Sequence, residues 1–359
     1  MKFNGWYLIL LVVLISQLNV TESQAQDPRF SQFYAAPFQI NPALTGVFEG
    51  KWRVNTIYRD QWGSILGSVP FRTVGASYEV RNRVGKGDYF AFGISALRDE
   101  VGDGHLIQNR AHLNFSYLKQ LGGGRTGRSG QYLVAGGQVG GGQNQVEFNN
   151  FWFSEQFDLS IGGFPNTSLD NRESALIGQS QNSDFFVDFN AGLLYYAVID
   201  NNTSFYAGAA IHHLNNPEIS FFDNSAESLS NRIVGHIGGE VGFNDELSLL
   251  PAAVFMNQGA LTSWTAGANI RYNNGDWNEV ALRMGLWPHF ASTETTRFYA
   301  ESVAVTAILE LNRINFGISY DITVSDLQEA NNSRGGFELS FSYVAKEKER
   351  RVKTICPKF

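Results

Sequence analysis

The feature that most constrains the fold of this 359-residue chain is an alternation of apolar and polar residues, which repeats from Trp52 nearly to the C-terminus. Alternating segments of about 10 to 15 residues are separated by Gly, Asn, Asp or Pro. One segment places five large apolar residues on a single face: Ile314, Phe316, Ile318, Tyr320 and Ile322. Because successive side chains of a strand point to opposite faces of a sheet, the pattern predicts strands with one apolar and one polar face. No segment sustains the spacing of a helix.

The alternation predicts an all-β chain with an even number of strands. The fourteen predicted strands span residues 52–62, 70–81, 88–99, 105–120, 131–144, 185–200, 203–215, 232–243, 247–257, 262–273, 279–290, 296–311, 313–324 and 335–346. They are longer than the five or six residues (roughly) that are usual in soluble proteins.

The predicted connections alternate in length. Four of them are tight, at 200–202, 244–246, 273–276 and 312–313, whereas 145–184 and 216–231 are long. Short turns on one rim and long loops on the other are typical of an outer-membrane barrel. We therefore predict an antiparallel transmembrane β-barrel of about 14 strands over residues 52–346, with both chain termini on the short-turn, periplasmic side. A soluble β-domain is the alternative.

Composition excludes several functions. A net charge of −7 argues against a nucleic-acid partner, which would need a basic surface. The single cysteine, Cys356, excludes an internal disulfide framework and a Cys-based zinc site. His212 and His213 are adjacent in a predicted strand, so we expect them on opposite faces and unable to bind one metal ion together. No nucleophile–base pair stands out. The sequence therefore indicates a protein without a cofactor that is not an enzyme.

Residues 1–25 have the organisation of a secretory signal peptide. Lys2 precedes an apolar run from Trp6 to Ile15, and a small-x-small step ends at Ala25. The run is short for a membrane span of about 20 residues. We predict cleavage after Ala25 and export of the mature chain, with an uncleaved anchoring helix as the alternative.

The next segment, 26–51, contains the dense stretch "DPRFSQFYAAPFQINPALTG" at 27–46. It is too aromatic for a disordered leader and too interrupted by proline for one helix. A barrel of fourteen strands encloses more space than its own inward side chains fill. We predict that 26–51 is a periplasmic plug or rim cover, in which Asn41 and Gly46 make the turn into the first strand. A docking segment for a partner is the alternative.

This stretch resembles a motif of the PorP/SprF family, which comprises outer-membrane proteins of the Bacteroidota type IX secretion and gliding system. The matching residues are Asp27, Pro28, Phe30, Ser31, Gln32, Phe33, Asn41, Pro42, Ala43 and Gly46. Similar stretches follow at "YRDQW" (58–62), 70–79, 316–321, 335–343 and the tail "TICPKF", which ends at Phe359. The resemblance spans the mature chain.

The resemblance implies an accessory barrel of the type IX protein secretion and gliding machinery. Such a barrel supports the export or surface anchoring of partner proteins through protein–protein contacts. The implied partners are outer-membrane lipid, periplasmic ring or lipoprotein components, and a large secreted adhesin or other exported substrate. We expect loops 145–184 and 216–231 to recognise the specific partner, because surface loops carry such functions.

Charged residues occupy the polar faces of several predicted strands. Five of them, of mixed sign, predict a salt-bridge network in the lumen, with a solute path as the alternative: Arg110, Asp188, Arg271, Arg283 and Glu338. Tryptophans near strand ends fit aromatic girdles: Trp52, Trp62, Trp264 and Trp287.

Three further stretches have plausible structural roles. Tyr58, Arg59, Asp60 and Trp62 predict an ion pair and a girdle tryptophan at the end of strand one, with a binding constellation as the alternative. The glycines in 136–143 suit tight curvature or close backbone approach. The basic tail 347–359 is predicted to leave the barrel on the periplasmic side, so that Cys356 is an odd thiol, prone to an intermolecular disulfide or exposed at the surface.

A second function remains open at this point. A fourteen-stranded barrel with an N-terminal insert could take up a hydrophobic solute, with the insert as its gate. The lumen discriminates the two hypotheses. An apolar pocket with a lateral gap would favour transport, and a charged, filled interior would favour a scaffold.

Overall fold

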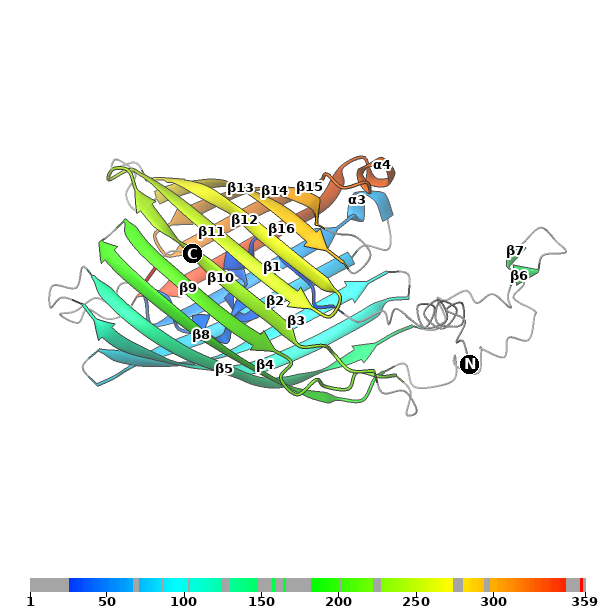
Figure 1. The fold of residues 1–359 in the computed structure, drawn as a ribbon, viewed down its shortest axis with the longest axis horizontal. Coiled ribbons are helices and arrows are strands. Elements are labelled where there is room, and N and C mark those ends of the chain that lie inside the picture. Colours follow the sequence, from blue (N-terminus) through cyan, green and yellow to red (C-terminus); the bar gives the residue numbers. More distant parts are fainter. Residues whose placement is uncertain are drawn as a thin grey trace, which may run out of the picture.

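The described chain forms a closed antiparallel barrel (Figure 1). The computed structural model describes residues 26–66, 71–85, 87–102, 104–123, 129–147, 157–158, 164–165, 182–200, 202–221, 227–273, 280–293, 298–346 and 356–357. Within these residues, no helix has the length and apolar character needed to cross a membrane.

Fourteen strands of the described chain build the barrel. They are β1 (Trp52–Gln61), β2 (Phe71–Val84), β3 (Asp88–Val101), β4 (Leu106–Gly122), β5 (Gly130–Gln145), β8 (Phe186–Asp200), β9 (Thr203–His212), β10 (Arg232–Gly242), β11 (Leu247–Gln258), β12 (Leu261–Tyr272), β13 (Val280–Ser292), β14 (Tyr299–Leu311), β15 (Ile314–Thr323) and β16 (Arg334–Ala345). Each pairs with its neighbours in sequence, and β1 pairs with β16 to close the ring. The two-residue strands β6 (Phe157–Asp158) and β7 (Phe164–Pro165) form a separate small sheet. The predicted fourteen-stranded barrel is confirmed, and its strand boundaries agree with the prediction to within three residues.

The alternation in the sequence separates the two faces of the barrel wall. Large apolar side chains point outward and are exposed, as shown by Ile94 on β3, Leu193 on β8 and Leu286 on β13, which are 57%, 58% and 58% exposed. The intervening residues point into the lumen and are buried, although many of them are polar. An apolar exterior around a polar interior is the arrangement that a lipid bilayer stabilises.

The two rims of the barrel differ in their connections. At the short-turn end the chain leaves β2, β4, β8, β10, β12 and β14, and at the long-loop end it leaves β1, β3, β5, β9, β11, β13 and β15. The short helices α3 (Gly63–Leu66) and α4 (Gln328–Asn331) also lie at the long-loop end (Figure 1). The alternation of lengths is not strict, because the two-residue turn 259–260 belongs to the long-loop end, where Gly259 has a φ of 54°.

Residues 26–50, here called the lumen segment, lie inside the barrel and appear in dark blue in Figure 1. The segment forms three short turns of helix: η1 (Phe33–Ala35), α2 (Pro37–Ile40) and η2 (Pro42–Leu44). Pro37 and Pro42 each begin a turn, where the missing N–H has no helical partner to lose. Asn41 caps η2 by accepting a hydrogen bond from the Ala43 N–H at 2.8 Å. Asn41 therefore shapes the segment rather than the turn into β1, which corrects our expectation.

The lumen segment crosses the barrel from one end to the other. At its start, the Asp27 N–H donates to Oε1 of Gln258, the last residue of β11 at the long-loop end, at 3.0 Å. At its finish, the Lys51 N–H donates to the carbonyl of Ala345 at the short-turn end, at 2.8 Å. The expectation that both ends of the mature chain lie at the short-turn end is therefore wrong for residue 26. That the short-turn end faces the periplasm stays a prediction.

Candidate functional site

The filled lumen is the candidate site, and its first group of polar contacts surrounds Asp27. The Asp27 carboxylate accepts hydrogen bonds from Arg110 and from His213 Nε2, the latter at 2.7 Å, and lies 2.9 Å from Nη1 of Arg232. Burial alone would raise the pKa of Asp27, but the two guanidinium groups and the histidine hold it well below its ordinary value. A buried carboxylate thus ties the start of the segment to β4, β10 and the end of β9.

His213 extends this group to a second carboxylate. Its Nδ1 lies 3.0 Å from Oδ1 of Asp188 on β8, whose other oxygen lies 3.0 Å from Nε2 of His112. Burial lowers the pKa of His213, but the two aspartates outweigh it and raise the pKa above its ordinary value. His212 and His213 are both buried, at 2% exposure each, so the prediction that they occupy opposite faces is wrong. β9 ends at His212, and a φ of 60° turns His213 inward.

The second group binds the main chain of the lumen segment. Both carboxylate oxygens of Glu338 on β16 accept N–H groups, from Ser31 at 2.7 Å and from Gln32 at 2.8 Å. Arg59 of β1 pairs with Glu338, and its Nη2 lies 2.8 Å from Asp321 of β15. This group joins the segment to both strands of the β1–β16 seam.

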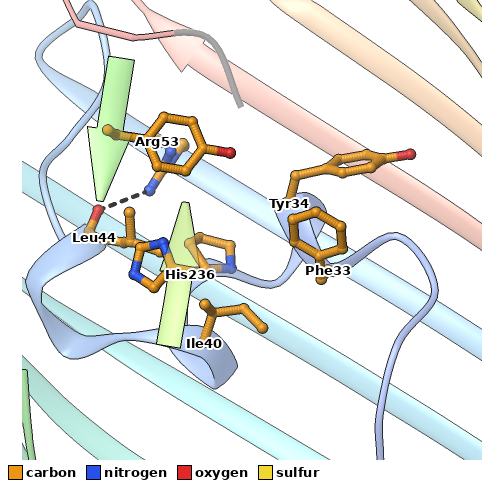
Figure 2. A pocket seen from close by; sticks show the side chains of 8 residues that line it. Phe33, Tyr34, Ile40, Leu44, Arg53 and His236 are labelled. Carbon is orange, nitrogen blue, oxygen red and sulfur yellow. Dashed lines mark hydrogen bonds between the residues drawn. The ribbon is translucent and has the colours of Figure 1, made fainter. Parts of the chain in front are cut away.

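The third group lies near the short-turn end. Glu79 of β2 accepts the N–H of Gly46 at 2.9 Å and pairs with Arg53 of β1 at 3.0 Å. Arg53 also donates to the carbonyl of Leu44 at 3.4 Å, which is the dashed contact in Figure 2. Gly46, with a φ of 79°, redirects the chain toward β1.

Apolar side chains of the segment fill the space between these groups. The Phe33 ring meets the Trp287 ring edge-on with centroids 5.2 Å apart, and Phe38 packs with Ile57 and Leu97. Trp287 is 1% exposed and faces the lumen from the middle of β13, so its prediction as a girdle residue is wrong. Alternation along β13 places Trp287 on the inward face, whereas a girdle residue faces outward. The prediction used its position near a strand end and not the face on which it lies.

In the described part of the chain, two cavities of about 20 Å³ each lie beside the segment. One lies against the Asp27 group. The other is lined by Phe33, Tyr34, Pro37, Ile40, Leu44, Arg53, Tyr206 and His236 (Figure 2). A water molecule needs about 10–15 Å³ by this measure, so each cavity holds little more than one water.

Asn41 anchors the middle of the segment to the wall. Its Nδ2 donates to the carbonyls of Leu193 at 3.0 Å and Ala209 at 3.2 Å, and lies 3.0 Å from Nε2 of His236. On the neighbouring strand β5, Gly136 touches the main chain at Pro42 and Ala43, and a Cβ added there would lie 2.5 Å from the Ala43 Cα. The expected close backbone approach in 136–143 is therefore present at Gly136.

The five charged residues predicted for the lumen all face inward, but they form three separate groups. Arg110 and Asp188 belong to the Asp27 group, and Glu338 belongs to the seam group. Arg271 and Arg283 pair with Glu310 of β14, with 2.9 Å between Arg271 Nε and Glu310 Oε2. The groups around Asp27 and Glu338 hold the lumen segment. The group around Glu310 instead links the neighbouring strands β12, β13 and β14.

The motif at the end of strand one is divided between the two faces. Arg59 points inward to Asp321 and Glu338, whereas the Tyr58 hydroxyl donates to Asp60 at 3.2 Å on the outer face. Trp62 follows β1 with a φ of 60° and meets Phe71 edge-on with ring centroids 5.2 Å apart. The ion pairs of Arg59 are thus formed with β15 and β16 rather than with its neighbour in sequence.

The described part of the tail returns to the barrel. Cys356 is 5% exposed, and its Sγ lies 3.3 Å from Nη1 of Arg81 and 3.9 Å from the Tyr196 hydroxyl. Burial raises the pKa of this thiol. The expectation of a thiol exposed at the surface is wrong, because Cys356 packs against Arg81 and Tyr196 at the short-turn end.

Several predictions fall outside the described residues. These are the signal peptide, most of loop 145–184, residues 222–226 of the second loop, and Phe359. The described base of loop 216–231 is ordered by main-chain bonds of 2.8 Å (Ile219 to Glu227) and 2.9 Å (Leu229 to Pro217), and it packs Ile219 and Leu229 against Phe186.

Four residues that bind the lumen segment or its partners were not predicted in that role: Glu79, Arg232, His213 and Asp321. Alternation alone places Glu79 and Asp321 on polar faces, and this signal could have found them. Among the described residues, no group of three or more His, Cys, Asp or Glu side chains is arranged to hold a metal ion.

An apolar outer wall, a charged inner wall and a lumen filled by the chain's own N-terminal segment define an outer-membrane β-barrel with a plugged pore. A family model described as "Type IX secretion system membrane protein PorP/SprF" matches residues 22–343. The chain belongs to the PorP/SprF family.

Comparison with solved structures finds other barrels. The TodX monoaromatic hydrocarbon channel (deltaS2 mutant) is 14% identical, with a TM-score of 0.47 over 86% of this chain and 93% of that one. The CymD monoaromatic hydrocarbon channel is 11% identical, with a TM-score of 0.45 over 88% and 94%. The toluene transporter TbuX of Ralstonia pickettii is 13% identical, with a TM-score of 0.44 over 87% and 94%. None of the curated protein sequences compared with this chain matches it.

Proposed function

We propose that the protein is an accessory barrel of the type IX protein secretion and gliding machinery, which supports export or surface anchoring of partner proteins through protein–protein contacts. Family membership supports the assignment to this machinery. The observation that carries the scaffold role is the filled lumen, where three polar groups hold residues 26–50 across the whole barrel. Because the chain's own segment fills the pore, we infer that the barrel acts through contacts made by its outer surface and loops.

The proposed partners are periplasmic ring or lipoprotein components, and a large secreted adhesin or another exported substrate, with outer-membrane lipid around the wall. Loops 145–184 and 216–231 are the proposed recognition elements for the exported partner. The strands that they connect, β5 to β8 and β9 to β10, end at the rim where the lumen segment begins, and long connections carry recognition functions more often than tight turns do.

A pull-down in mild detergent from native membranes tests this function. We expect the tagged wild-type barrel to co-purify ring subunits or a large exported protein. A matched variant in which a short Gly-Ser linker replaces residues 148–181 keeps every barrel strand and should lose the exported partner only. A barrel that purifies alone, with a bound lipid or fatty acid, would contradict the proposal.

The alternative is a 14-stranded uptake barrel for a hydrophobic solute, gated by the lumen segment. Each cavity of about 20 Å³ is far smaller than the roughly 300 Å³ or more that ligand pockets occupy. We expect no ion conductance from the wild-type protein in a planar bilayer, and steady conductance from a variant lacking residues 27–46. Conductance by the wild-type protein would support the uptake barrel instead.

A further inference from the structure

We propose that the short-turn end contains a binding site for a short polypeptide segment, and that the chain's own tail occupies this site as a removable strap. The site, here called the tyrosine chamber, is formed by Arg81, Tyr89, Tyr132 and Tyr196 from β2, β3, β5 and β8. The strap is the pair Cys356–Pro357. This inference concerns a different part of the molecule from the partner loops and does not depend on the proposed function.

The walls of the chamber are made by strand residues and not by the tail. Tyr132 and Tyr196 stack with ring centroids 5.1 Å apart and an interplanar angle of 17°. Tyr89 stands beside Tyr132 at 6.5 Å, and the Arg81 guanidinium lies over the Tyr89 ring at 4.7 Å. All three tyrosines are at most 4% exposed. Strand residues hold each wall, so the chamber is rigid.

The strap contacts both sides of the chamber and the lumen segment. The thiol of Cys356 lies 3.3 Å from Nη1 of Arg81 on β2 and 3.9 Å from the hydroxyl of Tyr196 on β8. The Cys356 N–H donates to Oε1 of Glu49 at 3.3 Å, and Glu49 belongs to the lumen segment. The strap therefore bridges β2 and β8 at the chamber and touches the end of the segment that fills the lumen.

The hydrogen bonds that the strap makes to described residues are those of a displaceable ligand. A thiol is a weak hydrogen-bonding group, and the bond from the Cys356 N–H to Glu49 is long at 3.3 Å. The described strap residues belong to no strand, unlike every wall of the chamber. Nine residues, 347–355, separate the strap from the last described residue of the wall, Lys346. Such a tether favours docking by raising the local concentration of the strap rather than by tight contacts.

The chamber also defines the chemistry of its ligand. Tyrosine rings and a guanidinium group favour a small, polarisable or apolar side chain, here the Cys356 thiol, which belongs to the buried core cluster. The buried Pro357 brings no N–H that would need a partner. We infer a short segment of the type small residue–proline, which enters from the short-turn end.

The test uses a chain that ends at Lys353, which keeps all fourteen barrel strands, and the fluorescent peptide Thr-Ile-Cys-Pro-Lys-Phe. We expect saturable one-to-one binding in detergent to the truncated chain. Binding to the full-length chain should be at least about tenfold weaker, because the strap competes from within the molecule. The matched variant Tyr196→Ala in the truncated chain should lose binding. Absence of binding to the truncated chain, or equal binding to both chains, overturns the proposal.

A second measurement uses the full-length protein, whose only thiol reports on the strap. We expect maleimide to label Cys356 at least about tenfold more slowly than in the denatured chain, because labelling requires the strap to open. Excess peptide carrying Cys356→Ala, which has no thiol, should accelerate labelling by keeping the strap out of the chamber. A labelling rate equal to that of the denatured chain, or one unchanged at saturating peptide, contradicts a removable strap.

Discussion

At the residue scale, Glu338 shows how the wall recognises the lumen segment. Its carboxylate is 0% exposed and accepts consecutive main-chain N–H groups from Ser31 and Gln32, while Arg59 supplies the balancing charge. Substitution of one partner leaves the others buried and unpaired, which costs about 3–5 kcal/mol for a buried ion pair. Glu338 therefore contributes more than an ordinary lumen residue.

We expect Glu338→Gln to lower the midpoint of thermal unfolding in detergent, with a loss of about 3 kcal/mol in the free energy of unfolding. The exposed Glu246→Gln, in the turn between β10 and β11, is the matched control and should leave the midpoint unchanged. An equal, small effect of both substitutions would show that the carboxylate does not anchor the segment.

The Asp27 group gives the lumen segment a dependence on pH. The pKa of Asp27 is lowered, so its contribution to stability is present above about pH 4 and is lost as the pH falls through the depressed pKa. The pKa of His213 is raised, so its contribution is present below about pH 6.5 and is lost as the pH rises through the raised pKa. Asp188, Arg110, Arg232 and His112 complete the group.

We therefore expect the unfolding midpoint in detergent to be highest between about pH 4 and pH 6.5. Asp27→Asn should flatten the decline on the acid side, and His213→Gln should flatten the decline on the alkaline side. A midpoint that changes with pH in the same way in all three proteins would rule out this group as the cause.

The partners of these residues could not be predicted from the sequence, for a physical reason. Asp27 meets Arg110, His213 and Gln258, which follow it by 83, 186 and 231 positions. Such contacts depend on how the ring closes and on the register between strands. The alternation along a single strand contains no information about either. Alternation predicts which face a charge occupies, and the five charges do face inward, but it does not predict which charges pair.

At the element scale, β5 combines two glycines with opposite roles. Gly136 faces inward and touches the main chain of the lumen segment, whereas the nearest atom to a Cβ added at Gly137 is the Asn190 carbonyl oxygen, at 3.7 Å. We expect Gly136→Val to destabilise the protein by about 1–3 kcal/mol through overpacking. Gly137→Val faces lipid and should be tolerated. The unfolding midpoint of each variant checks the pair, and equal tolerance of both would contradict close packing of the segment on β5.

The strands were predictable because lipid outside and a polar lumen inside enforce a period of two along every strand. The ends of the strands were less predictable than their positions. β9 ends three residues earlier than predicted, since the positive φ of His213 breaks the alternation that its neighbours in sequence suggest. The route of the lumen segment was not predictable either, because its short helical turns have no period that reveals a direction.

At the scale of the whole molecule, the lumen segment begins at the rim opposite to Ala345, where Asp27 bonds to Gln258. With Cys356→Ser as the background, we expect a membrane-impermeant maleimide to label Gln26→Cys in intact cells. Asp245→Cys, in a turn at the short-turn end, should be labelled only after the outer membrane is permeabilised. The reverse pattern would show that the barrel is inserted with its long loops toward the periplasm.

The seam contacts also link the lumen segment to the closure of the ring. Ser31 and Gln32 are bonded to Glu338 of the last strand, and Gly46 to Glu79 of the second. One short segment thus holds strands from the two ends of the barrel sequence at once. We therefore expect docking of the segment and pairing of the first strand with the last to depend on each other during assembly.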